Sequence, residues 1–174
     1  MPTTYYSRDT NSDLTDGGSF SYSLLKTAGT PNTLTGFAVG KLSTVSADLY
    51  TDPNDPSSQG SATGSWSFEI NIISGDAGVE LTPSLYRINS GGTVQAGPIA
   101  ATAQNTVAGV LTFGWTNPAL GTFNAGDRVR VGLSFLNGTH TNASLDIGFN
   151  DTDSEFIAPY TLAGPKPFAF AVWA

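Results

Sequence analysis

Apolar and polar residues alternate along three stretches of the chain. In Trp66–Ile72 the even positions are apolar, and in Val129–Phe135 and Ala143–Phe149 the odd positions are apolar. Neighbouring side chains on a β-strand point to opposite faces of a sheet, so this rhythm predicts strands with one buried face and one solvent-facing face. We therefore expect Glu69 and Arg130, which occupy the polar positions, to face solvent.

Seven further stretches show a weaker form of the same pattern. Turns rich in Gly, Pro, Asn and Asp separate them, and Asn89–Gly92 is expected to form a hairpin turn between two of them. Pro83 has no backbone N–H to donate, so we expect an edge strand or a bulge there. Leu42–Tyr50 is the only stretch with some helical character, and it also tolerates β structure. The seven stretches are Thr4–Arg8, Phe20–Leu25, Thr35–Val39, Val79–Ile88, Thr93–Gln95, Val110–Phe113 and Glu155–Ala158.

This density of short strands predicts an all-β fold. We expect an antiparallel, jelly-roll-like β-sandwich with about 8–10 strands, whose order the sequence leaves open. The length of 174 residues suits one domain, and the hydrophobic share of 39% is enough to fill its core. We expect residues 19–160 to form the sandwich, residues 1–18 an N-terminal arm or edge strand, and residues 161–174 an extended apolar C-terminal arm.

The charge composition argues against several partners. Charged residues make up only 12% of the chain, which has seven Lys and Arg and a net charge of -7. A phosphate backbone or an anionic membrane surface requires a basic stripe, so we expect no nucleic-acid and no membrane partner. Met1–Tyr5 has no basic region followed by an apolar run, so we expect no signal peptide. The absence of cysteine excludes disulfides and thiolate metal ligands.

Residues suited to catalysis are scarce. His140, the one histidine, lies in a polar loop where we expect it to be exposed, and no serine occupies a Gly-x-Ser-x-Gly elbow. Glycoside hydrolysis needs two facing carboxyl groups, and the three glutamates are Glu69, Glu80 and Glu155. We therefore expect no catalytic residue, no cofactor and no enzymatic activity.

Two features are candidate binding sites. Asn150–Glu155 places oxygen ligands at alternate positions, as calcium prefers, but Phe156 stands where an EF-hand loop needs glycine. We favour a solvated acidic turn and predict no metal site, while calcium binding by Asp151–Glu155 stays open. We expect Trp66 in the core, whereas Trp115 lies near a strand end and is a candidate platform for stacking on sugars.

Four segments together resemble a loose group of β-rich proteins encoded among the structural genes of tailed bacteriophages. The resemblance covers about residues 4–160, and each segment encodes strands and turns rather than chemistry. It implies a virion component, more often a capsid decoration (cement) protein than a fibre tip, and it brings no catalytic residue. The four segments are Thr4–Leu14, Gly64–Ile72, Leu85–Val94 and Phe123–Val131.

The resemblance also implies partners and a location. We expect contacts with the major capsid protein or other virion subunits, a homo-oligomer with a trimer favoured, and a place in the virion after synthesis in the host cytoplasm. The alternative function is a host-attachment or carbohydrate-binding β-sandwich of a tail fibre or spike, in which Trp115 would contact the sugar.

The two ends of the chain supply the candidate interface. In an extended strand over residues 168–174, Phe168, Phe170 and Val172 would lie on one face and Ala169, Ala171 and Trp173 on the other. An exposed apolar strand of this kind promotes aggregation. It must therefore be covered, either by its own sandwich or by a sister subunit or the capsid shell through strand addition. The N-terminal arm is the second candidate contact. The candidate interface residues are Tyr5, Tyr6, Phe168, Phe170, Val172 and Trp173.

Overall fold

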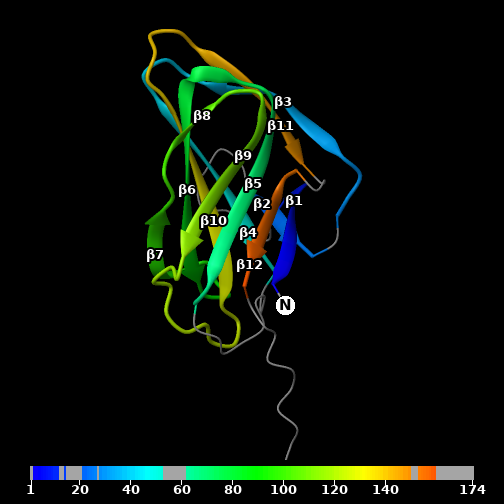
Figure 1. Ribbon diagram of the computed structural model, residues 1–174, viewed down its shortest axis with the longest axis vertical. Coiled ribbons are helices and arrows are strands. Elements are labelled where there is room, and N and C mark those ends of the chain that lie inside the picture. Colours follow the sequence, from blue (N-terminus) through cyan, green and yellow to red (C-terminus); the bar gives the residue numbers. More distant parts are fainter. Residues whose placement is uncertain are drawn as a thin grey trace, which may run out of the picture.

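The computed structural model describes residues 2–11, 14, 21–26, 28–52, 62–149 and 153–159. These residues contain twelve strands, and none of them belongs to a helix that could span a membrane. The prediction of an all-β fold is confirmed (Figure 1). The strands are β1 (Thr3–Asn11), β2 (Ser21–Leu25), β3 (Asn32–Val39), β4 (Thr44–Thr51), β5 (Ser65–Ser74), β6 (Asp76–Ile88), β7 (Val94–Ala100), β8 (Gln104–Thr106), β9 (Gly109–Thr116), β10 (Arg128–Asn137), β11 (Ala143–Phe149) and β12 (Glu155–Ala158).

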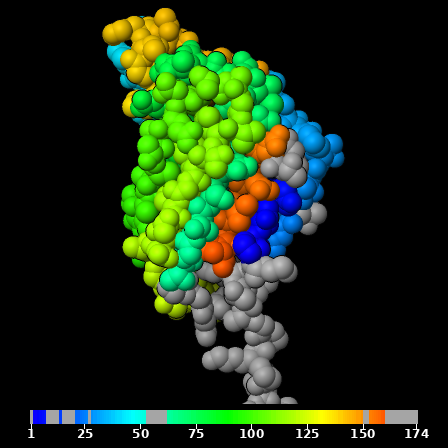
Figure 2. All heavy atoms as spheres, viewed as in Figure 1, coloured from blue at the N-terminus to red at the C-terminus, as the bar shows by residue number. Residues whose placement is uncertain are grey.

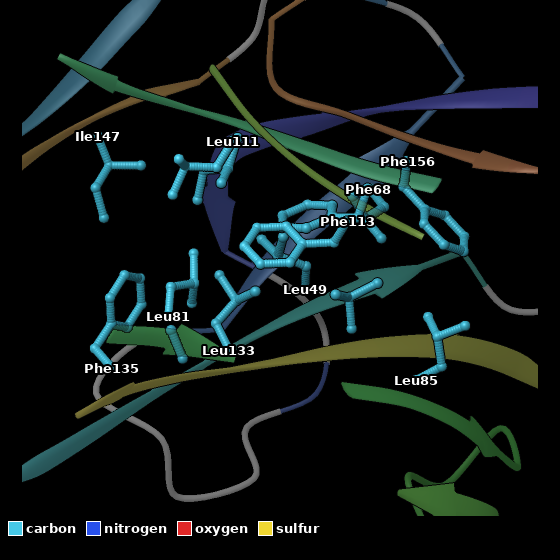
Figure 3. Packing of buried hydrophobic residues seen from close by; sticks show 14 of the residues in the cluster. Leu49, Phe68, Leu81, Leu85, Leu111, Phe113, Leu133, Phe135, Ile147 and Phe156 are labelled. Carbon is cyan, nitrogen blue, oxygen red and sulfur yellow. The ribbon is translucent and has the colours of Figure 1, made fainter. Parts of the chain in front are cut away.

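The strands form one hydrogen-bonded sheet that folds over on itself (Figure 1). Its order is β3-β11-β5-β12-β1-β2-β4-β10-β6-β7, with β9 on the other side of β5 and β8 beside β6. The pairings of the described strands are antiparallel apart from that of β2 with β4. As a result, β5, β9, β11 and β12 face β4, β6 and β10 across the core, as in a sandwich (Figure 3).

The core follows the predicted alternation. In β5 the apolar even positions of Trp66–Ile72 are at most 1% exposed, and in β10 the apolar odd positions of Val129–Phe135 are at most 2% exposed. The Phe68 ring stacks on that of Phe113 with centroids 6.4 Å apart. Figure 3 shows these side chains meeting between the layers. Each large side chain buried in this way contributes about 1.5–3 kcal/mol to stability.

The prediction of an edge strand or a bulge at Pro83 is wrong, because β6 is paired on both sides and its register with β10 runs through Pro83 without a shift. Pro83 lies in β6, in register with Leu133 of β10, and β6 also pairs on its other side with β8 and β7. On the side of β6 away from β10, the partner strand changes at Pro83: Leu81 pairs with β8, whereas Ser84 pairs with β7. The missing N–H therefore falls at the gap between two strands, where it interrupts no ladder.

The beginning of the chain is also more deeply embedded than predicted. β1 lies between β12 and β2, so residues 3–11 are neither a free arm nor an edge strand. Tyr5 is only 1% exposed, and its ring lies 5.9 Å from that of Phe156. The stretch Leu42–Tyr50 supplies most of β4 and no helix, because β4 pairs with both β10 and β2.

The hairpin expected at Asn89–Gly92 is confirmed. It joins β6 to β7, and the Asn89 N–H donates to the Thr93 carbonyl at 2.9 Å. Gly92 adopts a φ of +88°, a left-handed conformation that glycine tolerates best.

Candidate functional site

A polar cluster occupies the outer face of the layer formed by β4, β10 and β6. Arg130, on the central strand, is in register with Tyr50 of β4 and with Tyr86 of β6. Two residues further along β10, Gly132 is in register with Asp48. We use the name Asp48 cluster for Asp48, Tyr50, Tyr86, Arg128 and Arg130.

The contacts within the Asp48 cluster are close. The Arg130 Nε lies 3.7 Å from Asp48 Oδ1, and its guanidinium carbon lies 3.9 Å from the centre of the Tyr86 ring. A Cβ atom at Gly132 would stand 3.0 Å from the Tyr86 ring and 3.3 Å from Asp48 Oδ1. The glycine therefore leaves the space in which the carboxylate and the ring meet, and cation–π attraction adds to the ion pair.

These polar side chains are buried, which the sequence did not predict. Arg130 is 9% exposed, Asp48 8%, Tyr50 2% and Arg128 1%, although alternation placed the two arginines on a solvent-facing side. The face was predicted correctly, but the exposure was not. Burial depends on neighbours from other strands, and the flat Tyr86 ring beside Arg130 covers polar atoms that a single strand would leave in water.

Burial changes the proton affinity of the cluster. It raises the pKa of Asp48 to about 6, and the opposing effect of the Tyr50 hydroxyl is smaller. Burial also raises the pKa of Tyr86, with the Asp48 charge adding to the effect, and it lowers the pKa of Arg130. The cluster therefore holds a carboxyl group that exchanges its proton close to neutral pH.

A row of acidic side chains lies on the outer face of the other layer. β12 pairs with β5 at Phe156 and Phe68, so one step along this register Glu155 faces Glu69. The Thr112 hydroxyl of β9 donates to Glu69 Oε1 at 3.4 Å. Figure 2 shows β12 (orange) on the surface between β5 (green) and β1 (blue). Burial raises the pKa of Glu155, and the charges of Glu69 and Asp153 add to this. Two of the three glutamates thus meet, and Glu69 lies on the outer face as predicted, where it is half-buried.

The candidate calcium turn is only partly described. Asp151 lies outside the described residues, whereas Ser154 is fully buried, donates to the Gly148 carbonyl at 2.7 Å and accepts the Asn71 N–H at 3.1 Å. Within the described part of the chain, no group of three or more His, Asp and Glu side chains has an arrangement that could hold a metal ion. Ser154 thus ties this turn to β5 and β11.

The tryptophan proposed as a sugar platform is not exposed. Trp115 is 6% exposed, and its Nε1 donates to the Ile99 carbonyl at 2.9 Å. Its position in β9 opposite Trp66 turns it inward, because both belong to the core-facing set of their strands. Trp66 lies in the core, as predicted, and His140 is exposed in its loop.

The predicted interface residues fall into two groups. Tyr5 is buried in the core, and Tyr6 is half-buried beside Glu155 on the acidic face. The remaining residues lie outside the described part of the chain, so their contacts stay a prediction. They are Phe168, Phe170, Val172 and Trp173.

A surface that sequence reasoning missed lies at one end of the sandwich. Within the described residues, six large hydrophobic side chains are exposed. Five of them lie at the end of the sandwich where β3, β5, β8 and β10 end and β4 and β9 begin, with Leu136 on the outer face of one layer and Ile73 and Val110 on the outer face of the other. The strand connections there are tied together: the Leu42 N–H donates to the Thr139 carbonyl, and Thr106 Oγ1 donates to the Asp76 carbonyl. The sixth, Val94, follows the β6–β7 hairpin at the opposite end. We use the name apolar end for Leu42, Ile73, Val107, Val110 and Leu136.

No family model matches the chain, and no curated protein matches it significantly. Two solved structures are among those to which the chain is similar. One is a CocE/NonD family hydrolase from Staphylococcus aureus, with 9% identity and a TM-score of 0.54, covering 91% of this chain and 36% of that one. The other is a structure of infectious bursal disease virus, Gx strain, with 13% identity and a TM-score of 0.43, covering 85% and 36%.

The chain spans about a third of the length of either of these structures. The first likeness corrects our expectation that the chain is not an enzyme: its fold is one that an enzyme contains, although at 9% identity the likeness concerns the fold alone. The lack of a recognisable catalytic motif in an all-β chain therefore does not set it apart from enzymes. A TM-score of 0.43 does not establish a shared fold, so nothing about this chain follows from the second likeness.

Proposed function

We propose that this chain is a structural component of a tailed-phage virion, which binds other virion subunits and decorates the head shell. The observation that carries the proposal is the apolar end, where Leu42 is 58% exposed, Ile73 and Val107 are each 49%, Leu136 is 45% and Val110 is 44%. Several large apolar side chains exposed at one end of an otherwise polar domain suit a protein–protein contact at that end. The resemblance of residues 4–160 to phage structural proteins supports the same function.

The rest of the fold suits a protein that must be rigid and bind by contact. The core-facing side chains of both layers are closely packed, and each connection at the apolar end is pinned by hydrogen bonds. Asn137, which is fully buried, holds the β10–β11 loop through bonds from its Nδ2 to the Val39 and Thr141 carbonyls at 3.1 and 2.8 Å. A rigid contact surface loses little conformational entropy on binding, which favours affinity.

Peptide mass spectrometry and cryo-electron microscopy of the purified virion whose genome encodes the chain test this proposal. We expect the chain to be present in many copies, with density of this shape on the head shell and the apolar end turned toward it. Absence of the chain from particles that retain their other structural proteins would contradict the proposal.

A further inference from the structure

β3 forms one end of the sheet. It pairs with β11 on one side, and no described strand pairs with its other side. Thr33, Thr35 and Ala38 are all exposed, and Figure 1 shows β3 along the margin of the molecule. The sheet order ends at β7 on its other side, and β9 forms a further margin beside β5. The margin at β9 is covered in part, because Gln104 Nε2 donates to the Thr112 carbonyl of β9 at 2.7 Å. β3 is thus more accessible than β9 for a further strand.

The chemistry of β3 also favours strand addition. No charged residue occurs from 27 to 40, between Lys26 and Lys41. Edge strands are commonly protected by charged side chains, which oppose the approach of another strand. The protection that β3 does have is a bulge, where Gly36 adopts a φ of +68° and its N–H bonds to Asp146 Oδ1 at 2.8 Å. The bulge divides β3 into two short halves that each remain open to pairing.

The same chain contains a segment of matching character. Residues 168–174 are uncharged and entirely apolar, with Phe168, Phe170 and Val172 at one set of alternate positions and Ala169, Ala171 and Trp173 at the other. An extended peptide that joins a sheet edge gains main-chain hydrogen bonds and buries alternate side chains. Eight residues, 160–167, separate this segment from Pro159, the last described residue.

The length of that connector favours docking on another copy. Pro159 lies beside Gly64 at the start of β5, since a Cβ at Gly64 would stand 2.9 Å from it. Thr33 of β3 pairs with Gly148, which pairs with Asn71 of β5, seven positions beyond Gly64. From strand rise and spacing, this places the start of β3 about 25 Å away from Pro159. The nine Cα–Cα steps from Pro159 to residue 168 span at most about 32 Å, so the chain's own connector would have to be extended over most of its length.

We infer that residues 168–174 of one copy add as a strand to the β3 edge of a second copy. This inference rests on the proposed function and names one contact by which such subunits join. The contact is heterologous, because it joins different surfaces of the two copies, and contacts of this kind close into rings such as trimers when the rotation between copies permits.

Cysteine cross-linking tests the inference directly, because the wild-type chain has no cysteine. One batch carries Ala38→Cys and another carries Ala171→Cys, and the two are mixed under mild oxidation. We expect a covalent dimer of twice 18.0 kDa. Ser144→Cys is the matched control, since Ser144 is exposed and in register with Ala38 but one strand further from the edge. It should give little dimer with Ala171→Cys.

A chain that carries both Ala38→Cys and Ala171→Cys separates the two possible sources of the strand. At high dilution, an internal disulfide in a monomer would show that the segment docks on its own sandwich and would overturn the inference. Equal yields from Ala38→Cys and Ser144→Cys mixtures would overturn it as well, because they would indicate random collision.

Oligomer mass by light scattering provides an independent readout. We expect the wild-type chain to be oligomeric, whereas Ala38→Lys and a chain truncated after residue 167 should be monomers with an unchanged melting temperature. Ser144→Lys should remain oligomeric. A monomeric wild-type chain, or an Ala38→Lys oligomer, contradicts the inference. Self-association in a chain that is absent from virions would instead uphold the inference and reject the proposed function.

Discussion

The Asp48 cluster and the apolar end reverse the usual distribution of side chains in opposite ways. In the cluster, two arginines and an aspartate are at most 9% exposed, whereas at the apolar end five aliphatic side chains are at least 44% exposed. Buried charge must be matched by close partners, so changes there are expected to alter stability. Exposed apolar surface contributes little to folding, so changes there are expected to alter association. The two regions therefore separate changes that are expected to alter folding from changes that are expected to alter association.

The largest effect is expected from Arg130→Met, which keeps much of the side-chain volume but removes the charge. It leaves Asp48 buried without the guanidinium at 3.7 Å and removes the stacking on Tyr86. We expect the free energy of unfolding, measured in urea at neutral pH, to fall by about 3–4 kcal/mol while the oligomer mass is unchanged. A loss below about 1 kcal/mol would mean that the cluster behaves like an exposed ion pair.

The second effect is a pH dependence caused by Asp48. The pKa of this carboxyl is about 6 in the folded chain against an ordinary value of 3.8, so the folded state binds this proton more tightly than the unfolded state does. The stabilisation from this group is therefore complete below about pH 4 and is lost as the pH rises through 6, by up to about 3 kcal/mol.

Asp48→Asn provides the control for this pH dependence. Urea titrations from pH 4 to pH 8 should show a smaller decline for the variant than for the wild type, because the amide does not titrate in this range. Parallel curves for the two proteins would assign the pH dependence to other groups.

A smaller effect is expected from Gly132→Ala. The added methyl group would meet the Tyr86 ring at 3.0 Å and Asp48 Oδ1 at 3.3 Å, so both must shift. We expect a loss of about 1–2 kcal/mol in the free energy of unfolding. Gly138→Ala is a suitable comparison, because a Cβ there has no heavy atom within 4 Å. If the two variants were equally stable, the Asp48 cluster would be loosely packed.

The smallest stability effect is expected at the apolar end and has the opposite sign. Leu42 adopts a φ of +48°, which is unfavourable for leucine and more acceptable for asparagine. Leu42→Asn should therefore raise the free energy of unfolding by up to about 1 kcal/mol while reducing binding to the virion. Thermal denaturation and co-sedimentation with particles measure the two quantities. A marked loss of stability would show that Leu42 belongs to the folding core.

The sequence predicted the core strands because burial on the inner face imposes a two-residue rhythm. It failed where exposure depends on neighbouring strands: Arg128 and Arg130 have the spacing of solvent-facing residues, yet Tyr50 and Tyr86 flank Arg130 across the sheet. Pro83 was misjudged for the same reason, because a gap between β8 and β7 is a property of the sheet. The apolar end was missed because its members are single residues far apart in the sequence, and only the turns between strands bring them to the same end of the sandwich.

The central claim is that the apolar end is the surface by which this chain binds a virion. The most direct test compares Leu136→Ser with Val94→Ser, which remove side chains of nearly equal exposure, 45% and 43%, from opposite ends of the sandwich. Each purified variant is titrated onto virions that lack the chain, and the bound fraction is measured by co-sedimentation. The account predicts that Leu136→Ser binds at least several-fold more weakly than the wild type, whereas Val94→Ser binds like it. Equal binding by the two variants would contradict the claim.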